Sequence, residues 1–151
     1  MKTAIFDIDG TLSDCRARLC HILDGQPDWN AFHAECHLDP VNEPVAELLR
    51  QLAQRSWTII LCTGRPWRYA EATKGWMNRQ GLVYHNLMMR EDDDKQSDVD
   101  LKRRMLKGLR DLGHDVRMVF EDRQRVVDMW REEGVFCIGL GGFFQSFACV
   151  H

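Results

Sequence analysis

The first residues, MKTAIFDIDGT (residues 1–11), lead from an apolar stretch directly into two carboxylates, Asp7 and Asp9. In a strand, residues i and i+2 point to the same face, so this spacing would crowd two like charges together. A bound Mg²⁺ would offset the repulsion, because hard cations prefer oxygen ligands and often keep only one or two carboxylates. Gly10 permits a sharp turn, and Thr11 can donate a hydrogen bond to an oxyanion or cap the segment that follows. An acidic surface turn is the alternative, since Asp-Gly is a common turn pair.

Apolar, β-prone stretches alternate with helix-like stretches along the chain. The strand-like stretches are Thr3–Phe6, Trp57–Cys62, Tyr84–Met89, Arg117–Phe120 and Val135–Leu140. The helix-like stretches are Pro44–Arg55, Pro66–Gln80, Asp98–Leu112 and Arg123–Glu133, with prolines in the first turn and glycines just past the end. This alternation predicts an α/β fold with a parallel sheet flanked by helices. Ligands bind beyond the carboxyl ends of such strands, so the polar residues after the first four stretches are expected to converge on one crevice.

Length and composition favour a single domain over residues 1–151, since the chain has 151 residues and 44% of them are hydrophobic. The formal net charge of −3 argues against strong non-specific binding to nucleic acid, but not against contact with a nucleic-acid end. No apolar run approaches the roughly 20 residues of a membrane span. Because the chain starts directly in a strand pattern, we expect no secretory signal, no membrane partner and a cytoplasmic location.

Six cysteines are present: Cys15, Cys20, Cys36, Cys62, Cys137 and Cys149. Without a secretory signal, reduced thiols are favoured over a disulfide framework. Cys62 and Cys137 lie within apolar runs and are predicted to be small core residues. The segment 15–37 also contains three histidines, but no CxxC pair, so packing is favoured over a zinc site there.

Four motifs between Asp7 and Asp128 follow one another in a recognisable order. They are the strand before DxDGT, a second strand followed by Thr63, the later Lys102 and a final acidic pair. This set resembles the haloacid dehalogenase-like (HAD) phosphohydrolases, and it implies a Rossmann-like three-layer sandwich with a small helical cap insertion after the first strand. The segments TGRP (63–66), MMR (88–90), SDVDLK (97–102) and FEDRQRVVDMW (120–130) are similar to the 3′-phosphatase domain of phage polynucleotide kinase and its stand-alone relatives.

The resemblance implies a role for each motif residue. Asp7 would be the nucleophile that forms an aspartyl-phosphate, and Asp9 the general acid and then the general base. Because the ordinary pKa of Asp is about 3.9, Asp9 must be perturbed by its surroundings to be protonated near neutral pH. Thr63 and Lys102 would hold the phosphate oxygens. The implied Mg²⁺ ligands are Asp7, Asp9, Glu121 and Asp122, and the implied substrate-binding residues are Gly10, Thr11, Gly64, Arg65 and Arg90.

Some of these residues have structural alternatives. Taken alone, Lys102 fits a solvated helix surface and Thr63 a helix N-cap. The phage subfamily has Asp where this chain has Glu121, whose longer side chain can reach a metal-bound water. Asp128 either assists the metal site or caps or solvates a helix, and Arg123 is either part of the site or a structural ion-pair partner.

Residues 12–43 are enough for a short flap but not for a large cap domain. An uncovered site suits a phosphate on a bulky molecule, such as a polynucleotide end. Trp29 and Phe32 either stack on a base or anchor the flap, and anchoring is favoured. The phosphate loop GxxxxGK[ST] of a kinase is not found, so we expect dephosphorylation only. The leading hypothesis is a Mg²⁺-dependent phosphatase of nucleic-acid 3′ ends that needs no obligate protein partner. The alternatives are a phosphatase of free nucleotides or another small ester, and a non-catalytic phosphoryl receiver or binding domain.

Overall fold

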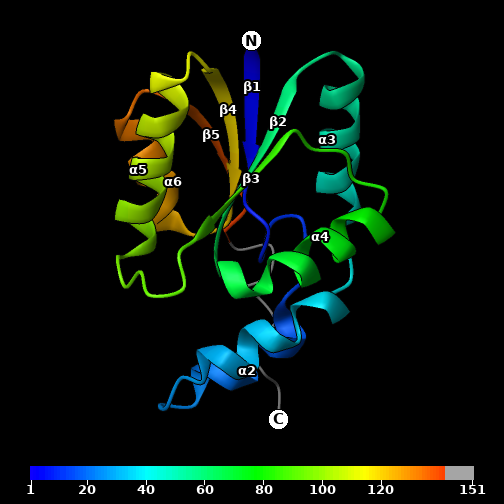
Figure 1. Ribbon diagram of the computed structural model, residues 1–151, viewed down its shortest axis with the longest axis vertical. Helices are drawn as coiled ribbons and strands as arrows, with labels where there is room; N and C mark the ends of the chain where they lie inside the picture. Colours follow the sequence, from blue (N-terminus) through cyan, green and yellow to red (C-terminus); the bar gives the residue numbers. More distant parts are fainter. Residues whose placement is uncertain (142–151) are drawn as a thin grey trace.

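The computed structural model describes residues 1–141, and its centre is one sheet of five strands in the order β3-β2-β1-β4-β5. The strands are β1 (Lys2–Phe6), β2 (Thr58–Pro66), β3 (Asn86–Arg90), β4 (Asp115–Glu121) and β5 (Phe136–Gly139). Every neighbouring pair is parallel. The predicted parallel sheet is therefore confirmed, and β1, which carries the acidic motif at its end, lies in the middle of it (Figure 1).

Helices cover both faces of this sheet, which confirms the three-layer architecture. The main helices are α3 (Glu43–Gln54), α4 (Ala70–Arg79), α5 (Asp98–Asp111) and α6 (Gln124–Glu132). In Figure 1, α5 and α6 lie together on one side of the sheet and α3 lies on the other. Their bounds agree closely with the predicted ones except near Pro66. The prediction that a helix begins at Pro66 is wrong, because this residue is extended and pairs with Arg90 as the last residue of β2, before a short 3₁₀ helix, η3 (Trp67–Tyr69).

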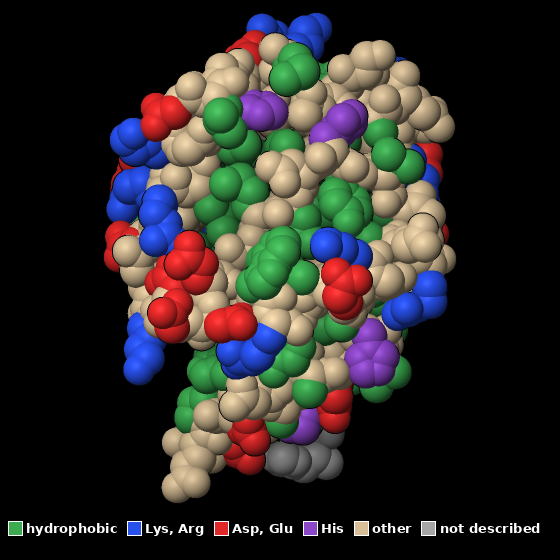
Figure 2. Space-filling model, viewed as in Figure 1, with side chains coloured by type: hydrophobic (Ala, Val, Ile, Leu, Met, Phe, Trp, Pro, Cys, Tyr) green, Lys and Arg blue, Asp and Glu red, His purple; other side chains and the backbone are tan. Residues whose placement is uncertain are grey.

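Alternation along β1 gives each face of the sheet its own hydrophobic cluster. Ile5 joins the cluster beneath α5 and α6, whereas Ala4 and Phe6 join the cluster beneath α3 and α4. All three side chains are fully buried. Strand β3 lies at an edge of the sheet and is only half-buried. On the side of the molecule drawn in Figure 2, hydrophobic side chains gather in the middle and charged side chains lie around them.

The insertion between β1 and α3 folds into short helices at the carboxyl ends of the strands, as Figure 1 shows. They are η1 (Arg16–Arg18), α1 (Cys20–Leu23), α2 (Trp29–Ala34) and η2 (Cys36–Leu38). This confirms the predicted small helical insertion.

The cysteines follow the packing interpretation. Cys15 and Cys36 are buried in the insertion, and Cys62 and Cys137 are buried in the core, whereas Cys20 is exposed. Cys149 lies outside the described residues. Over residues 1–141, no helix is both long enough and apolar enough to cross a membrane.

Candidate active site

The acidic motif stands just beyond β1, where the chain leaves the sheet. The backbone N–H of Asp7 donates to the Phe120 carbonyl at 3.0 Å, which ties this residue to β4. The chain then turns at Gly10, whose φ of +81° favours glycine. A Cβ atom at Gly10 would lie only 2.3 Å from Oδ2 of Asp122, so the turn also needs a residue without a side chain. The turn separates the two carboxylates, and Asp7 and Asp9 have different partners.

Asp7 belongs to a buried cluster of three carboxylates and one ammonium group. Oxygens of Asp7, Glu121 and Asp122 lie within 4.8 Å of one another. From α5, Lys102 Nζ donates to Asp7 Oδ1 at 2.7 Å and to Glu121 Oε2 at 2.6 Å. Thr11 Oγ1 donates a longer bond of 3.5 Å to Asp7 Oδ2. Lys102 is 3% exposed, so the interpretation of this residue as a solvated helix surface is wrong.

The cluster carries more negative charge than its single ammonium group balances. Burial, followed by the charge of Glu121, raises the pKa of Asp7 to about 6, although Lys102 opposes the shift. Burial and then the charge of Asp7 raise the pKa of Asp122 to about 9. In addition, Asp122 Oδ1 is buried and has no hydrogen-bond partner within residues 1–141. Three converging carboxylates with a free oxygen fit a divalent cation such as Mg²⁺, because hard cations prefer oxygen ligands.

Asp9 lies outside this cluster and is held by two arginines. Arg18 Nη2 donates to Asp9 Oδ1 at 2.6 Å, and Arg65 donates from Nη2 at 2.7 Å and from Nε at 3.0 Å. Burial by itself would raise the pKa of Asp9, but the guanidinium of Arg65 and then that of Arg18 hold it well below its usual range. The direction is opposite to the upward shift that a general acid needs at neutral pH. Asp9 is therefore a carboxylate in the protein without substrate.

Arg18 connects this carboxylate to the insertion. Its guanidinium donates to both oxygens of Asp39, at 2.7 and 2.5 Å, and to the Phe32 carbonyl at 2.7 Å. Sequence analysis missed both Arg18 and Asp39. No short motif contains them, and their pairing spans 21 residues, so only the folded insertion reveals it.

The segment from Thr63 to Arg65 forms an irregular end of β2. The register of β2 with β3 shifts between Cys62 and Pro66, and bulges of this kind are common next to active sites. Thr63 Oγ1 accepts a hydrogen bond from the Arg65 N–H at 3.2 Å, within the strand, so the N-cap interpretation of Thr63 is wrong. Arg65 is fully buried and donates to Thr73 Oγ1 as well as to Asp9. The guanidinium expected to meet substrate thus contacts Asp9 instead.

Arg90 and Arg123 both pair with Asp98, another residue that sequence analysis missed. Arg90 Nη2 donates to Asp98 Oδ1 at 2.7 Å and its Nε donates to the Gly64 carbonyl at 3.1 Å. Arg123 pairs with the other oxygen of Asp98, which agrees with its interpretation as an ion-pair partner. Asp128 is exposed and accepts a hydrogen bond within its own helix, as a helix-solvating residue does.

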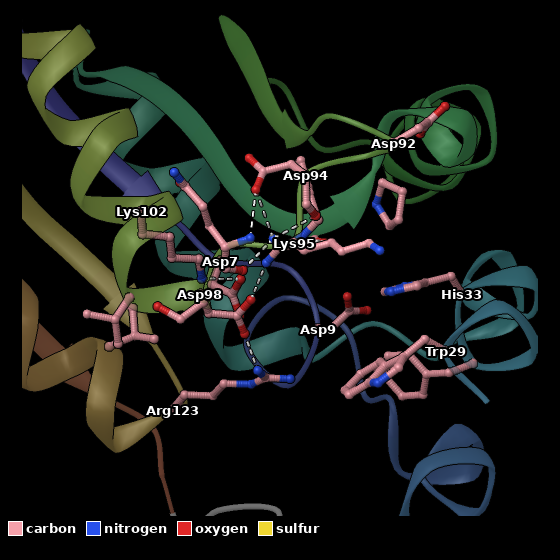
Figure 3. A pocket seen from close by; sticks show the side chains of 18 of the residues that line it. Asp7, Asp9, Trp29, His33, Asp92, Asp94, Lys95, Asp98, Lys102 and Arg123 are labelled. Atoms are coloured by element: carbon pink, nitrogen blue, oxygen red, sulfur yellow. Dashed lines mark hydrogen bonds and ion pairs between the residues drawn. The ribbon is translucent and has the colours of Figure 1, made fainter. Parts of the chain in front are cut away.

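A cavity of about 520 Å³ lies at the carboxyl ends of the strands, and its lining includes Asp7, Asp9 and Lys102. Asp7 and Lys102 lie on one side, Trp29 and His33 of α2 lie on the other, and Asp9 lies between them in the view of Figure 3. Among the residues that sequence analysis assigned to substrate, Gly64 and Arg90 line the cavity. The lining also includes basic side chains at its rim, namely Arg68, Lys95, Arg123 and Arg125.

Comparison with known proteins identifies this arrangement. Residues 1–141 match the family described as the polynucleotide kinase PNKP phosphatase domain. Among solved structures, a chain of a Pnkp1/Rnl/Hen1 complex is 31% identical, with a TM-score of 0.78 over 93% of this chain and 45% of that chain. A second structure, of the Pnkp1/Rnl/Hen1 RNA repair complex, is also 31% identical, with a TM-score of 0.77 over 91% of this chain and 42% of that chain.

This chain therefore spans less than half of the length of either of those chains. A class C acid phosphatase from Bacillus anthracis with tungstate bound shares the fold, with a TM-score of 0.62 at 15% identity over 95% of this chain and 69% of that one. The family match confirms the predicted phosphatase class. The chain belongs to the family of polynucleotide kinase PNKP phosphatase domains, within the haloacid dehalogenase-like phosphatases.

Proposed function

We propose that this phosphatase is a Mg²⁺-dependent phosphomonoesterase that removes 3′-phosphates from nucleic-acid ends through an aspartyl-phosphate intermediate. The observation that supports it best is the position of the Asp7 carboxylate, which lines the cavity with Lys102 Nζ at 2.7 Å and two further carboxylates beside it. A nucleophile, a cation that offsets charge and a set of metal-binding oxygens are the parts that phosphoryl transfer needs.

In the first step, an Asp7 oxygen attacks phosphorus and the bond from phosphorus to the leaving oxygen breaks. Lys102 offsets the negative charge of the non-bridging oxygens from its place beside Asp7. Mg²⁺ held by Asp7, Glu121 and Asp122 would supply further neutralisation of that charge. In the second step, water attacks the phosphorus of the aspartyl-phosphate, which releases inorganic phosphate and restores Asp7.

Asp9 is assigned the proton transfers. Arg18 and Arg65 keep it ionised before substrate binds, so its pKa must rise when the negative charge of a phosphate group arrives. It would then give its proton to the leaving oxygen and take one from the attacking water. The two arginines fix its orientation for both steps.

A polynucleotide end is the favoured substrate because of the family to which the chain belongs and because of the relatives, one of which is part of an RNA repair complex. The small insertion leaves a cavity of about 520 Å³ with basic side chains at its rim, which suits a phosphorylated terminal nucleotide and the strand attached to it.

The test is phosphate release from a 3′-phosphorylated oligonucleotide, a 5′-phosphorylated one and free mononucleotides. We expect the first to be hydrolysed fastest, whereas a preference for mononucleotides would overturn the end-specific assignment. Asp7→Asn should abolish release without unfolding the protein, and Asp9→Asn should lower it by about 10²–10⁴-fold. Asp111→Asn, which alters an exposed carboxylate paired with Lys107, is the matched control and should leave turnover unchanged. Near-normal turnover by Asp7→Asn would refute covalent catalysis at this residue.

A further inference from the structure

An aromatic wall closes the cavity on the side away from the carboxylate cluster. It is made by Trp29, Phe32 and His33 of α2, all of which line the cavity. The Trp29 ring stacks near His33, with centroids 6.0 Å apart, and meets Phe32 edge-on at 5.6 Å. The His33 ring also lies 5.5 Å from that of Tyr69, which ties the insertion to the segment after β2.

The two large rings of this wall have different surroundings. Phe32 is 3% exposed and the Arg18 guanidinium lies over its ring at 4.3 Å, so it anchors the insertion as expected. Trp29, in contrast, is 46% exposed and lines the cavity. Exposure of a large aromatic ring at a binding cavity leaves a flat apolar surface on which another ring can stack.

His33 carries a buried ring nitrogen that no group in the described part of the chain satisfies. It is 8% exposed, and its Nδ1 atom has no hydrogen-bond partner among the described residues. Burial, assisted by the charges of Arg65 and Arg18, lowers the pKa of His33 to about 4, so the ring is neutral at physiological pH. A neutral imidazole offers one donor and one acceptor. A buried polar group of this kind costs stability unless a ligand satisfies it.

The wall lies where the leaving group must go. Asp9 must touch the oxygen that leaves phosphorus, and Figure 3 shows Asp9 between the carboxylate cluster and the wall, with the His33 ring directed toward it. A phosphate bound at Asp7 therefore places the molecule attached to its leaving oxygen against Trp29 and His33.

We propose that Trp29 and His33 form the subsite for the nucleoside that carries the scissile phosphate. The base stacks on the Trp29 ring, and the His33 ring forms a hydrogen bond with the nucleoside. This inference rests on the proposed action on nucleic-acid ends and names the residues that recognise the terminal unit.

The first test compares two 3′-phosphorylated oligonucleotides that differ only in the terminal unit, one with a base and one abasic. Because base stacking on an aromatic side chain is worth about 1–3 kcal/mol, Trp29→Ala should lower kcat/KM for the normal end by roughly 5- to 150-fold. On the abasic end, the same variant should stay within about threefold of the unaltered protein, since no stack is lost there. Trp29→Phe, which keeps an aromatic face, should retain most of the activity.

Trp67→Ala is the matched control, because Trp67 is 50% exposed but does not line the cavity. It should change kcat/KM for neither oligonucleotide. A loss of activity in Trp29→Ala that is equal on both ends, or no loss on either, would overturn the subsite. If the unaltered protein released no phosphate from 3′ ends, the proposed function itself would fail instead.

His33→Leu provides an independent test. Replacing a buried ring whose Nδ1 atom has no hydrogen-bond partner among the described residues by an apolar side chain should raise Tm. The loss of the hydrogen bond to the nucleoside should raise KM for the normal end by about tenfold with kcat nearly unchanged. A lowered Tm together with an equal loss of kcat on both oligonucleotides would show a structural role and contradict the proposal. An unchanged KM would also contradict it.

Discussion

Replacement of Arg18 by Gln is expected to destabilise the protein strongly, although this residue touches none of the three clustered carboxylates. Arg18 is 1% exposed and is the main partner of Asp39, whose side chain is 2% exposed. Arg65 lies 3.9 Å from Asp39 and cannot replace it, because its donors already serve Asp9 and Thr73. The variant therefore leaves a buried carboxylate without a hydrogen-bonded cation.

Breaking a buried ion pair from one side costs about 3–5 kcal/mol, since the remaining charge stays buried and uncompensated. A domain of this size has a total free energy of unfolding of about 5–15 kcal/mol. At about 2–4 °C of Tm for each kcal/mol, the variant should melt roughly 6–20 °C lower. Arg55→Gln is the control, because Arg55 is exposed at the end of α3 and its change should cost less than about 0.5 kcal/mol.

The loss of stability in Arg18→Gln should increase as the pH rises. Burial already raises the pKa of Asp39 while Arg18 opposes the shift, so removal of Arg18 raises it further. A carboxyl group with a raised pKa in the folded state binds a proton more tightly there than in the unfolded state, so stability falls as pH rises toward that pKa. Asp9, whose pKa is lowered, stays ionised between pH 5 and pH 7.5, so it does not contribute to the pH dependence of stability there.

Urea unfolding of Arg18→Gln and of the unaltered protein at pH 5 and pH 7.5 measures this effect. The penalty should be larger at pH 7.5, by about 1.4 kcal/mol for each unit by which the pKa of Asp39 rises between these two pH values. The double variant with Asp39→Asn should recover much of the loss, since it removes the orphaned charge. A penalty below about 1 kcal/mol, or an equal penalty at both pH values, would refute the reasoning for this buried pair.

Three further changes test the cluster itself. Gly10→Ala should abolish turnover, because its Cβ would collide with Asp122. In a urea titration it should lower the free energy of unfolding by more than the roughly 1–2 kcal/mol that a left-handed backbone costs, whereas Gly81→Ala, with open space around it, should cost only that amount. Lys102→Met should eliminate phosphate release in a colorimetric assay, and Lys107→Met, on the exposed face of the same helix, should not. Mg²⁺ at 100 times its Kd should stabilise the protein by about 2.7 kcal/mol in a thermal melt, and a similar gain in Asp122→Asn would exclude this residue as a ligand.

The sheet and its main helices could be predicted because each is encoded locally. Helix α5 illustrates this, since Ser97 Oγ accepts a hydrogen bond from the Asp100 N–H and the apolar residues of the helix recur at helical spacing. The predicted helix start at Pro66 was wrong because proline is tolerated both in the first turn of a helix and in extended backbone such as the end of β2. A local signal of this kind cannot choose between them.

The site was predictable only where a motif held its residues together. Asp7 and Lys102 were identified in this way and lie 2.7 Å apart in the fold. The roles of Arg18, Asp39 and Asp98 were not predicted. Each forms ion pairs that the fold brings together, and no motif or residue spacing in the sequence indicates those pairs. Arg65 stands within a recognised motif, yet its burial against Asp9 was not visible from that motif.

The insertion does more than enclose one side of the cavity, because its Arg18 forms an ion pair with Asp9. Two cations and two anions balance one another in the protein interior, one of each from the insertion and one of each from the carboxyl ends of β1 and β2. Exchange or shortening of residues 12–43 that removed Arg18 would therefore raise the pKa of Asp9, the residue assigned to proton transfer, as well as change the shape of the entrance. Changes in this insertion that keep Arg18 paired with Asp39 leave the surroundings of Asp9 intact, and the exposed Trp29 is a position that can change without removing either partner of that pair.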